Sequence, residues 1–118
     1  MEFKQSKSIY QQIAERLADE ILSGEYLVGD RVPSVREYAA SVMVNANTVM
    51  RSYDYLQTEG VIFNKRGIGY FVADDAIERI KAIHRKEFLN GEMNYFFSRL
   101  RALGITPDEL KQMYEQNS

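Results

Sequence analysis

The apolar positions near the start of the chain repeat at helical spacing. One stripe contains Ile9, Ile13, Leu17 and Ile21. A spacing of four residues places these side chains on one face of a helix. Ser8 and Gln11 fit a capping box, and Gly24 is a typical helix end. The pattern therefore predicts a helix from Ser8 to near Gly24 with one buried stripe.

Two more helical patterns follow after a loop. Ser34 and Glu37 form a second capping-box pattern, which predicts a short helix to about Val42. Asn45 can cap a third helix that ends at Gly60. The inward face predicted for this third helix consists of Val49, Tyr53 and Leu56. Two helices joined by a short turn are the loosest form of a helix-turn-helix.

The next segment predicts a β-hairpin. Residues 61–63 and 70–72 are β-prone runs, and the polar segment 64–69 between them contains two glycines. Lys65 and Arg66 are expected at the tip. A hairpin with two cations at its tip after a helix-turn-helix is typical of a wing, so we expect a mainly α fold with a small β-hairpin wing.

The remaining residues predict a helical tail. A helix is expected from Asp75 to about Leu103, nearly continuous through Gly91 although glycine weakens a helix. Thr106 and Glu109 then open a last helix. A stripe at spacings of four, three, four and three consists of Leu89, Met93, Phe96, Leu100 and Leu103. Such a stripe is more often simple core than an interface.

The size of the tail nevertheless favours pairing with a second subunit. Two helices cannot bury its phenylalanines alone, and large exposed apolar patches mark interaction sites. A C-terminal two-helix dimerisation region is therefore predicted. The interface expected for this dimer contains Phe88, Met93, Phe96, Phe97 and Leu100.

Composition limits the alternatives. A chain of 118 residues with 45% hydrophobic and 27% charged residues is one globular domain with an appendage. We expect a winged helix-turn-helix domain over 1–74 and a dimerisation tail over 75–118. The chain has no cysteine, which excludes disulfides and thiol chemistry. It also shows no long apolar run, so we expect a cytoplasmic protein without a membrane span.

The sequence offers little for catalysis. His84 is the only histidine, and no serine lies in a nucleophile-elbow pattern that would need it as a base. Gly67 and Gly69 match neither a dinucleotide-binding nor a P-loop motif. We therefore expect no catalytic residues, no metal and no cofactor.

The net charge of −2 argues against a nucleic-acid binder, whose surface is usually basic. Within residues 31–72, however, five basic residues face three acidic ones: Arg31, Arg36, Arg51, Lys65 and Arg66 against Glu37, Asp54 and Glu59. The first turns of a helix in the major groove can reach base edges, while flanking cations hold phosphates. Asn45 is equally explained as a plain helix cap, and Arg36 and Arg51, each taken alone, as solvated surface charges.

Residues 9–72 resemble the N-terminal domain of the GntR family of bacterial transcriptional regulators. The resemblance rests on the segments Tyr10-Gln11-Gln12-Ile13, Ile21-Leu22-Ser23-Gly24, Gly29-Asp30-Arg31-Val32-Pro33-Ser34, Asn47-Thr48-Val49, Leu56, Glu59-Gly60 and Arg66-Gly67-Ile68-Gly69-Tyr70-Phe71-Val72. With its short tail, the chain most resembles the YtrA-like subgroup, whose tail is understood to form two helices that pair the subunits.

The resemblance implies a repressor that binds an inverted-repeat operator in double-stranded DNA as a homodimer. It implies DNA contacts at Arg36, at 45–48, at residue 50 and at Arg66 and Gly67. Arginines common in the family are absent where Ala46 and Met50 stand, which leaves Asn47 and Arg51 as expected polar readers. The DNA-binding residues predicted in total are Arg36, Asn45, Ala46, Asn47, Thr48, Met50, Arg51, Lys65, Arg66 and Gly67.

Two other functions fit the sequence. A winged-helix module that binds a protein partner would explain the net negative charge directly. A regulator gated by a metabolite at the dimer interface is the second alternative, although two helices per subunit enclose little of the 300–1,000 Å³ or so that such a pocket needs.

Overall fold

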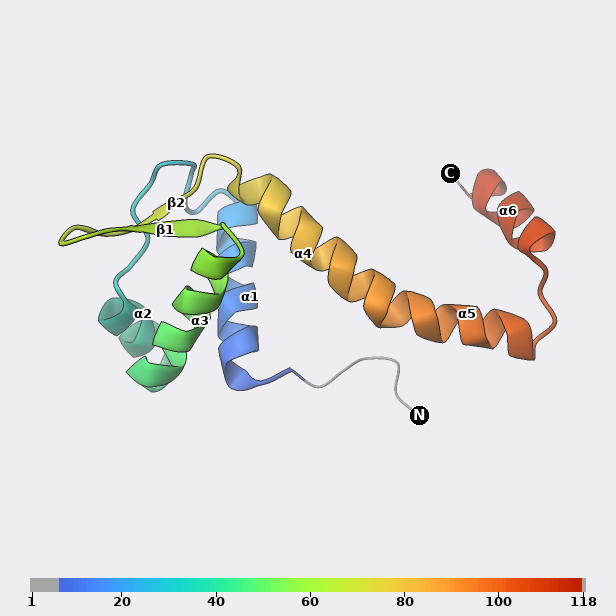
Figure 1. Ribbon diagram of the computed structural model, residues 1–118, viewed down its shortest axis with the longest axis horizontal. Coiled ribbons are helices and arrows are strands. Elements are labelled where there is room, and N and C mark those ends of the chain that lie inside the picture. Colours follow the sequence, from blue (N-terminus) through green and yellow to red (C-terminus); the bar gives the residue numbers. More distant parts are fainter. Residues whose placement is uncertain (1–6, 118) are drawn as a thin grey trace. The chain divides into compact units, whose positions relative to one another are not determined.

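The computed structural model describes residues 7–117 as a mainly α-helical chain with one small β-hairpin (Figure 1). In chain order the elements are α1 (Ile9–Leu22), α2 (Val35–Val42), α3 (Ala46–Thr58), β1 (Ile62–Lys65), β2 (Gly69–Val72), α4 (Ala76–Asn90), α5 (Glu92–Ala102) and α6 (Pro107–Gln116). Two helices, a third helix and a hairpin follow in the order that the sequence predicts. The predicted fold class, mainly α with a hairpin wing, is confirmed.

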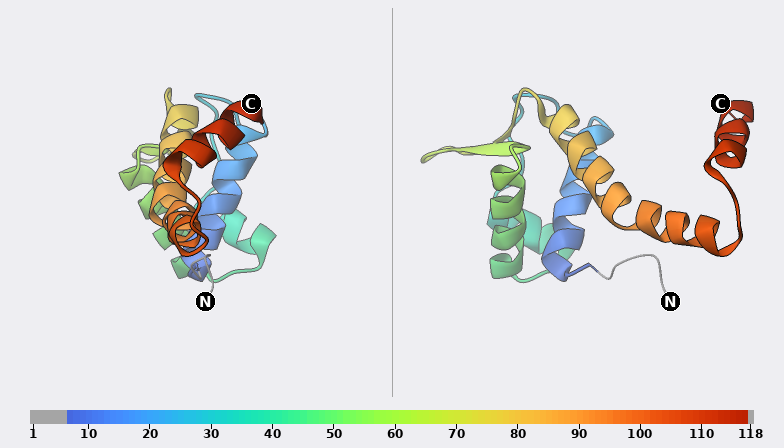
Figure 2. Two further views of the ribbon diagram at one scale, coloured as in Figure 1. Left: turned by 90° about the vertical axis from the view of Figure 1, so that its right-hand side faces the viewer. Right: turned by 45° about the vertical axis from the view of Figure 1, so that its right-hand side comes forward.

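The described chain forms two compact units, residues 7–84 and residues 85–117. In the first unit α1, α2 and α3 pack together and the hairpin projects beyond them (Figure 2). The domain boundary expected near residue 74 lies just before α4. The boundary between the two compact units instead falls within that helix, between residues 84 and 85.

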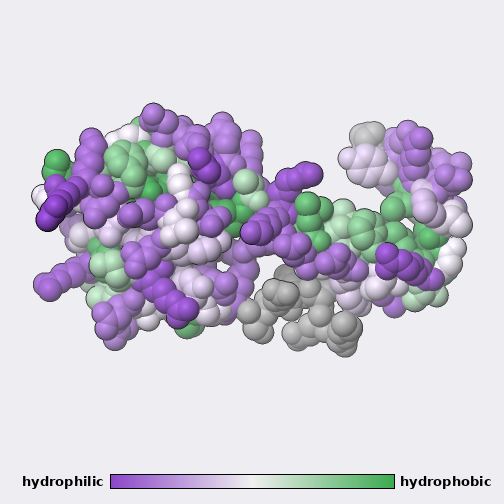
Figure 3. Space-filling model, in the orientation of Figure 1, coloured by the Kyte–Doolittle hydropathy of each residue, from purple (hydrophilic) through white to green (hydrophobic). Residues whose placement is uncertain are grey.

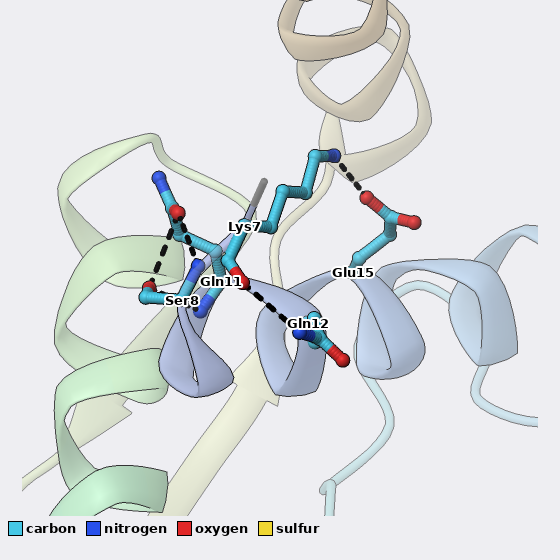
Figure 4. Close-up of polar contacts among 5 residues, drawn as sticks. All are labelled: Lys7, Ser8, Gln11, Gln12 and Glu15. Carbon is cyan, nitrogen blue, oxygen red and sulfur yellow. Dashed lines mark hydrogen bonds and ion pairs between the residues drawn. The ribbon is translucent and has the colours of Figure 1, made fainter. Parts of the chain in front are cut away.

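Helix starts follow the predicted capping boxes. In α1 the Gln11 backbone N–H donates to Ser8 Oγ (3.3 Å), and the Ser8 N–H donates to Gln11 Oε1 (2.9 Å; Figure 4). Ser34 and Glu37 form the same pair of bonds at the start of α2, at 3.1 and 2.9 Å. A capping box satisfies two backbone donors that a helix start leaves free. These local contacts explain why the helix starts could be predicted.

The core of the first unit lies between α1, α3 and the base of the hairpin. The predicted inward residues of α3, namely Val49, Tyr53 and Leu56, are fully buried. The Tyr53 hydroxyl donates to the Pro33 carbonyl (2.7 Å), and Ser52 Oγ donates to the Tyr10 carbonyl (2.7 Å). These two bonds join α3 to the loop before α2 and to the start of α1.

One residue of the predicted α1 stripe is not buried. Ile13, Leu17 and Ile21 lie in the core, but Ile9 is 55% exposed. Ile9 is the first residue of α1 and lies at the edge of the helix bundle, so the expectation that it is buried is wrong.

The turn between α2 and α3 contains an unusual backbone conformation. Met43 ends α2 with φ 57° and ψ 47°, the left-handed region, and its side chain is 91% exposed. The Val44 N–H donates to the Ala39 carbonyl (3.1 Å). A non-glycine residue in this region costs about 1–2 kcal/mol, and the exposed side chain recovers little of that cost by packing.

The hairpin has two distinct faces because side chains alternate along a strand. The strands pair antiparallel, with Ile62 opposite Val72 and Asn64 opposite Tyr70. We call the face formed by these four residues the inner face, since Ile62 and Val72 are buried in the core. The outer face consists of Phe63, Lys65, Gly69 and Phe71. An isolated antiparallel β-bridge also pairs Arg31 with Phe71 of β2.

The tail helix is not continuous. Ala76 and Ile80 at the start of α4 are buried in the core of the first unit. The helix ends at Asn90, and Gly91 takes φ −115° and ψ −88° before α5 begins at Glu92. The expectation of near continuity through Gly91 therefore needs correction: the single helix becomes two, because glycine lowers helix stability by about 1 kcal/mol relative to alanine.

The last two helices have no core of their own. Thr106 and Glu109 form the predicted capping box at the start of α6. Neither α5 nor α6 contains a buried residue. Their apolar side chains therefore remain exposed or only half-buried within the described chain.

Candidate nucleic-acid interface

The exposed side of α3 carries the predicted base-contacting residues. Val49, Ser52, Tyr53 and Leu56 point into the core. At about 100° per residue, the opposite side of the helix carries Asn47, Met50, Arg51 and Asp54, which are all exposed. Asp54 was not among the predicted site residues. This surface is polar apart from Met50, and the opposite side of the same helix is buried in the core.

The residues at the start of α3 include a helix cap and exposed side chains. Asn45 Oδ1 accepts a hydrogen bond from the Asn47 backbone N–H (2.7 Å), so the capping interpretation of Asn45 is confirmed. Ala46 and Asn47 are exposed. Thr48 is half-buried, and its carbonyl accepts a hydrogen bond from Ser52 Oγ (3.1 Å).

Arg51 is held in place by an aromatic ring. Its guanidinium carbon lies 4.1 Å from the centroid of the Tyr10 ring, and that ring packs edge-on against Tyr55 (6.4 Å between centroids). A cation over an aromatic face gains about 0.5–1 kcal/mol at exposed sites. Tyr10 on α1 thus fixes a side chain of α3, a role that sequence reasoning missed because the two residues are far apart in the chain.

Arg36 lies in the first turn of α2 with its side chain exposed. It forms no ion pair with residues 7–117. Beside it, hydrogen bonds from Ser34, with a smaller contribution from the Arg31 charge, lower the pKa of the Glu37 carboxyl. That carboxylate is engaged in the capping box, which leaves the Arg36 guanidinium available to an external anion.

The two wing cations occupy different places. Arg66 and Gly67 lie in the turn between the strands and are exposed. Lys65 is the last residue of β1 and belongs to the outer face, where its Nζ lies 4.6 Å from the centroid of the Phe71 ring. Phe71 in turn stacks on Phe63 with centroids 5.9 Å apart. The tip therefore presents Arg66, whereas Lys65 rests on the outer face.

The inner face of the wing contacts α3 through a residue that was also missed. The Tyr70 hydroxyl donates to Met50 Sδ (3.9 Å), and its ring packs edge-on against the buried Tyr53 ring, with centroids 5.0 Å apart. Burial, with a smaller contribution from Asp54, raises the pKa of Tyr70. Its hydroxyl therefore remains a proton donor over the whole physiological range.

Acidic side chains gather on another surface. Glu15 and Asp19 lie on the side of α1 that is turned away from its buried residues. Glu20 accepts a hydrogen bond from the Tyr38 hydroxyl of α2 (2.8 Å). Among the residues that the structure describes, no cluster of three or more acidic or histidine side chains could hold a metal ion. Within the same range, no helix has the length and apolar character needed to span a membrane.

The model of the bacterial regulatory proteins of the gntR family matches residues 9–72, more than half of the chain. This chain belongs to the GntR family. It is therefore a DNA-binding transcriptional regulator, as the sequence resemblance predicts.

Relatives of similar length support the family assignment of this GntR protein. It is 36% identical to the transcriptional regulator YhcF of Bacillus subtilis over 92% of this chain and 88% of the relative. It is 31% identical to the transcriptional repressor YtrA of the same organism over 95% and 83%. These names indicate a transcription regulator, a class that is typically not enzymatic.

Solved structures of GntR proteins share the fold. A GntR-family regulator from Bacteroides thetaiotaomicron is 51% identical with a TM-score of 0.79, and the match covers 92% of this chain and 95% of that one. YtrA from Sulfolobus acidocaldarius is 27% identical with a TM-score of 0.53, over 98% and 92%. The fold of the chain is thus also found in solved structures of related GntR regulators.

Proposed function

We propose that this GntR regulator binds an inverted-repeat operator as a homodimer and represses transcription there. The observation that carries the proposal is the exposed side of α3, where Asn47, Met50 and Arg51 stand on a fully packed helix with the wing beside them. A helix of this kind fits the major groove, about 12 Å wide, and the wing turn is then placed against the adjacent backbone.

The predicted DNA-binding residues fall into two groups, those that contact phosphates and those that contact bases. Arg36, Lys65 and Arg66 hold phosphates and set the position of α3, and the Gly67 backbone lies close to the sugar–phosphate chain at the wing turn. Asn47 and Arg51 read base edges, while Ala46 and Met50 offer apolar contact to thymine methyl groups. Asn45 and Thr48 complete the first turn of α3, with Asn45 serving mainly as its cap.

Exposure of the tail supports the homodimer. The predicted interface residues Phe88, Phe96 and Phe97 are each at least 38% exposed, and Met93 and Leu100 are half-buried. Figure 3 shows apolar side chains gathered on the unit of residues 85–117. A second copy of the chain would cover this surface. A twofold dimer also places two recognition helices about 34 Å apart, one turn of DNA.

Repression, rather than activation, is proposed because of a relative that is named a repressor. The B. subtilis relative YtrA is named a repressor and matches nearly the whole chain. The second compact unit, residues 85–117, contains only α5, α6 and the end of α4. We therefore propose occupancy of the operator as the means of repression.

Salt dependence of DNA binding tests the proposal. Purified protein is titrated against a selected duplex and a random duplex at several salt concentrations. Wild-type affinity should fall steeply with salt, and Arg36→Ala or Arg66→Ala should reduce the slope by about 0.9 per phosphate contact in each subunit. Arg16→Ala is the matched control, since Arg16 lies on α1 and pairs with Glu20 (3.6 Å).

Two outcomes would count against the DNA-binding mode. Absence of binding at low salt, or affinity indifferent to salt, would favour the winged-helix protein-interaction module. Slopes unchanged in both arginine variants would remove α2 and the wing tip from the interface. A metabolite-gated mechanism would be supported only by a compound that changes operator affinity as well as thermal stability.

A further inference from the structure

The inner face of the wing points toward the side of α3 where DNA is proposed to bind. Asn64 and Tyr70 are directly opposite each other in the hairpin register, which places their β-carbons about 5 Å apart on one face. Tyr70 reaches Met50 on α3, so this pair lies between the recognition helix and the wing turn. A duplex seated on α3 would meet these two side chains at its backbone.

The hydrogen-bond donors of both side chains are engaged weakly or not at all by the described part of the chain. Within residues 7–117 the Tyr70 hydroxyl donates only to Met50 Sδ, at 3.9 Å, and a thioether is a weak acceptor. The Asn64 side chain is exposed and makes no hydrogen bond with residues 7–117. Little is therefore lost when either donor turns to an oxygen of DNA.

We propose that Asn64 and Tyr70 form a neutral phosphate clamp, in which the Asn64 amide and the Tyr70 hydroxyl donate to the DNA backbone between the groove read by α3 and the groove met by the wing tip. The inference rests on the proposed DNA-binding mode. It adds two residues that the sequence did not single out, both uncharged.

An uncharged clamp has a distinctive signature. Cationic contacts release counterions, so their removal changes the slope of affinity against salt. A neutral donor releases none, and its removal lowers affinity equally at every salt concentration. A phosphate contact carries no base information either, so specific and random duplexes should be affected alike.

The test uses the full-length chain with Tyr70→Phe and Asn64→Ala. Each variant should bind both duplexes about tenfold more weakly, the scale expected when a hydrogen bond to a charged group is lost, with the salt slope unchanged. Tyr114→Phe and Gln12→Ala are matched controls, because they remove the same groups from α6 and from α1. Neither control should change affinity.

Repeating the Tyr70→Phe substitution in a Met50→Leu background tests whether Tyr70 contacts DNA directly or only positions Met50. In Met50→Leu the sulfur acceptor is gone, and Tyr70→Phe should still weaken binding to random DNA by the same factor. No further loss in that background would show that Tyr70 acts only by holding Met50, which overturns the clamp. Wild-type affinity in Tyr70→Phe and Asn64→Ala would also overturn it.

The arginine variants keep this failure distinct from failure of the proposed function. If Arg36→Ala and Arg66→Ala reduce the salt slope while Tyr70→Phe has no effect, only the clamp is wrong. If wild-type protein fails to bind either duplex, the DNA-binding mode itself is wrong. Circular dichroism of each variant checks that the fold is intact.

Discussion

The guanidinium of Arg31 lies across Gly69, so closely that a β-carbon at position 69 would be 2.8 Å from Arg31 Nε. Gly69 also has φ +143°, which disfavours any side chain. By contrast, a β-carbon at Gly67 would meet no atom within 4 Å. Glycine is therefore needed at the two wing positions for different physical reasons: at position 69 it leaves room for the Arg31 side chain, and at position 67 it allows the backbone to turn.

Gly69→Ala should lower the free energy of unfolding by about 1–3 kcal/mol, since backbone strain and crowding of Arg31 act together. In an Arg31→Ala background the cost should fall, because only the backbone strain remains. Gly67→Ala serves as the control with backbone strain alone. Urea denaturation measures all three. Equal costs of Gly69→Ala in both backgrounds would show that Arg31 does not constrain the position.

Met43→Gly should stabilise the first unit by about 0.5–1 kcal/mol, because glycine adopts the left-handed conformation of the helix-turn-helix turn without steric cost. The gain is limited by the greater freedom of glycine in the unfolded chain. Met43→Ala is the control, since it removes the exposed side chain and keeps the strain. Thermal and urea unfolding would contradict the expectation if glycine were no better than alanine.

Tyr53→Phe should make the protein less sensitive to alkali. Burial raises the pKa of Tyr53 in the folded chain, while an unfolded tyrosine titrates near pH 10. Its contribution to stability is therefore complete below about pH 10 and declines as pH rises toward the folded pKa. At neutral pH the variant should have a free energy of unfolding about 1 kcal/mol lower, because the hydrogen bond to Pro33 is lost. Above about pH 10 its free energy of unfolding should fall less steeply with pH than that of the wild type. Tyr114→Phe, at an exposed position, should leave the alkaline slope unchanged.

Asn47→Ala should cost about 1–3 kcal/mol of binding free energy on the preferred duplex and little on random DNA. Asn45→Ala provides the comparison: loss of the cap should lower stability by about 1 kcal/mol with less effect on sequence preference. Anisotropy titrations on both duplexes decide between them. Equal loss on the two duplexes would remove Asn47 as a base reader.

Phe96→Asp should give monomers with an intact winged domain, because Phe96 is 44% exposed and contributes to no core within the described chain. Ser98→Asp is the control on the same helix, about 200° away from Phe96. Sedimentation velocity measures the association state, and circular dichroism the fold. Dimers that persist in Phe96→Asp would place the interface elsewhere.

Local patterns made most of the fold predictable. Helix starts at Ser8, Ser34 and Thr106 depend on contacts three residues apart, and all three capping boxes are present. The hairpin follows from short β-prone runs around glycines in the same way. Gly91 was identified as the weak point of the tail helix, but near continuity was expected because glycine costs a helix only about 1 kcal/mol relative to alanine.

The site was less accessible to sequence reasoning because its details depend on packing between distant segments. Arg51 was identified, but its position on the Tyr10 ring depends on the way α1 packs against α3. Lys65 was identified, but its place on the outer face follows from the pairing register of the hairpin. Tyr70 and Asn64 carry no charge and were not among the predicted DNA-binding residues, and only that same register brings them together.

The path of α4 has a consequence for the evolution of operator recognition. Its first turns are rooted in the core of the first unit by Ala76 and Ile80, and the same helix continues to Phe88. Each residue inserted between Ile80 and Phe88 would rotate everything beyond it by about 100° and advance it by about 1.5 Å. Insertion of seven residues nearly restores the angle and adds about 10 Å. We propose that, in a dimer paired through the tail, the length of α4 and the residues on the exposed side of α3 can change independently of each other during evolution.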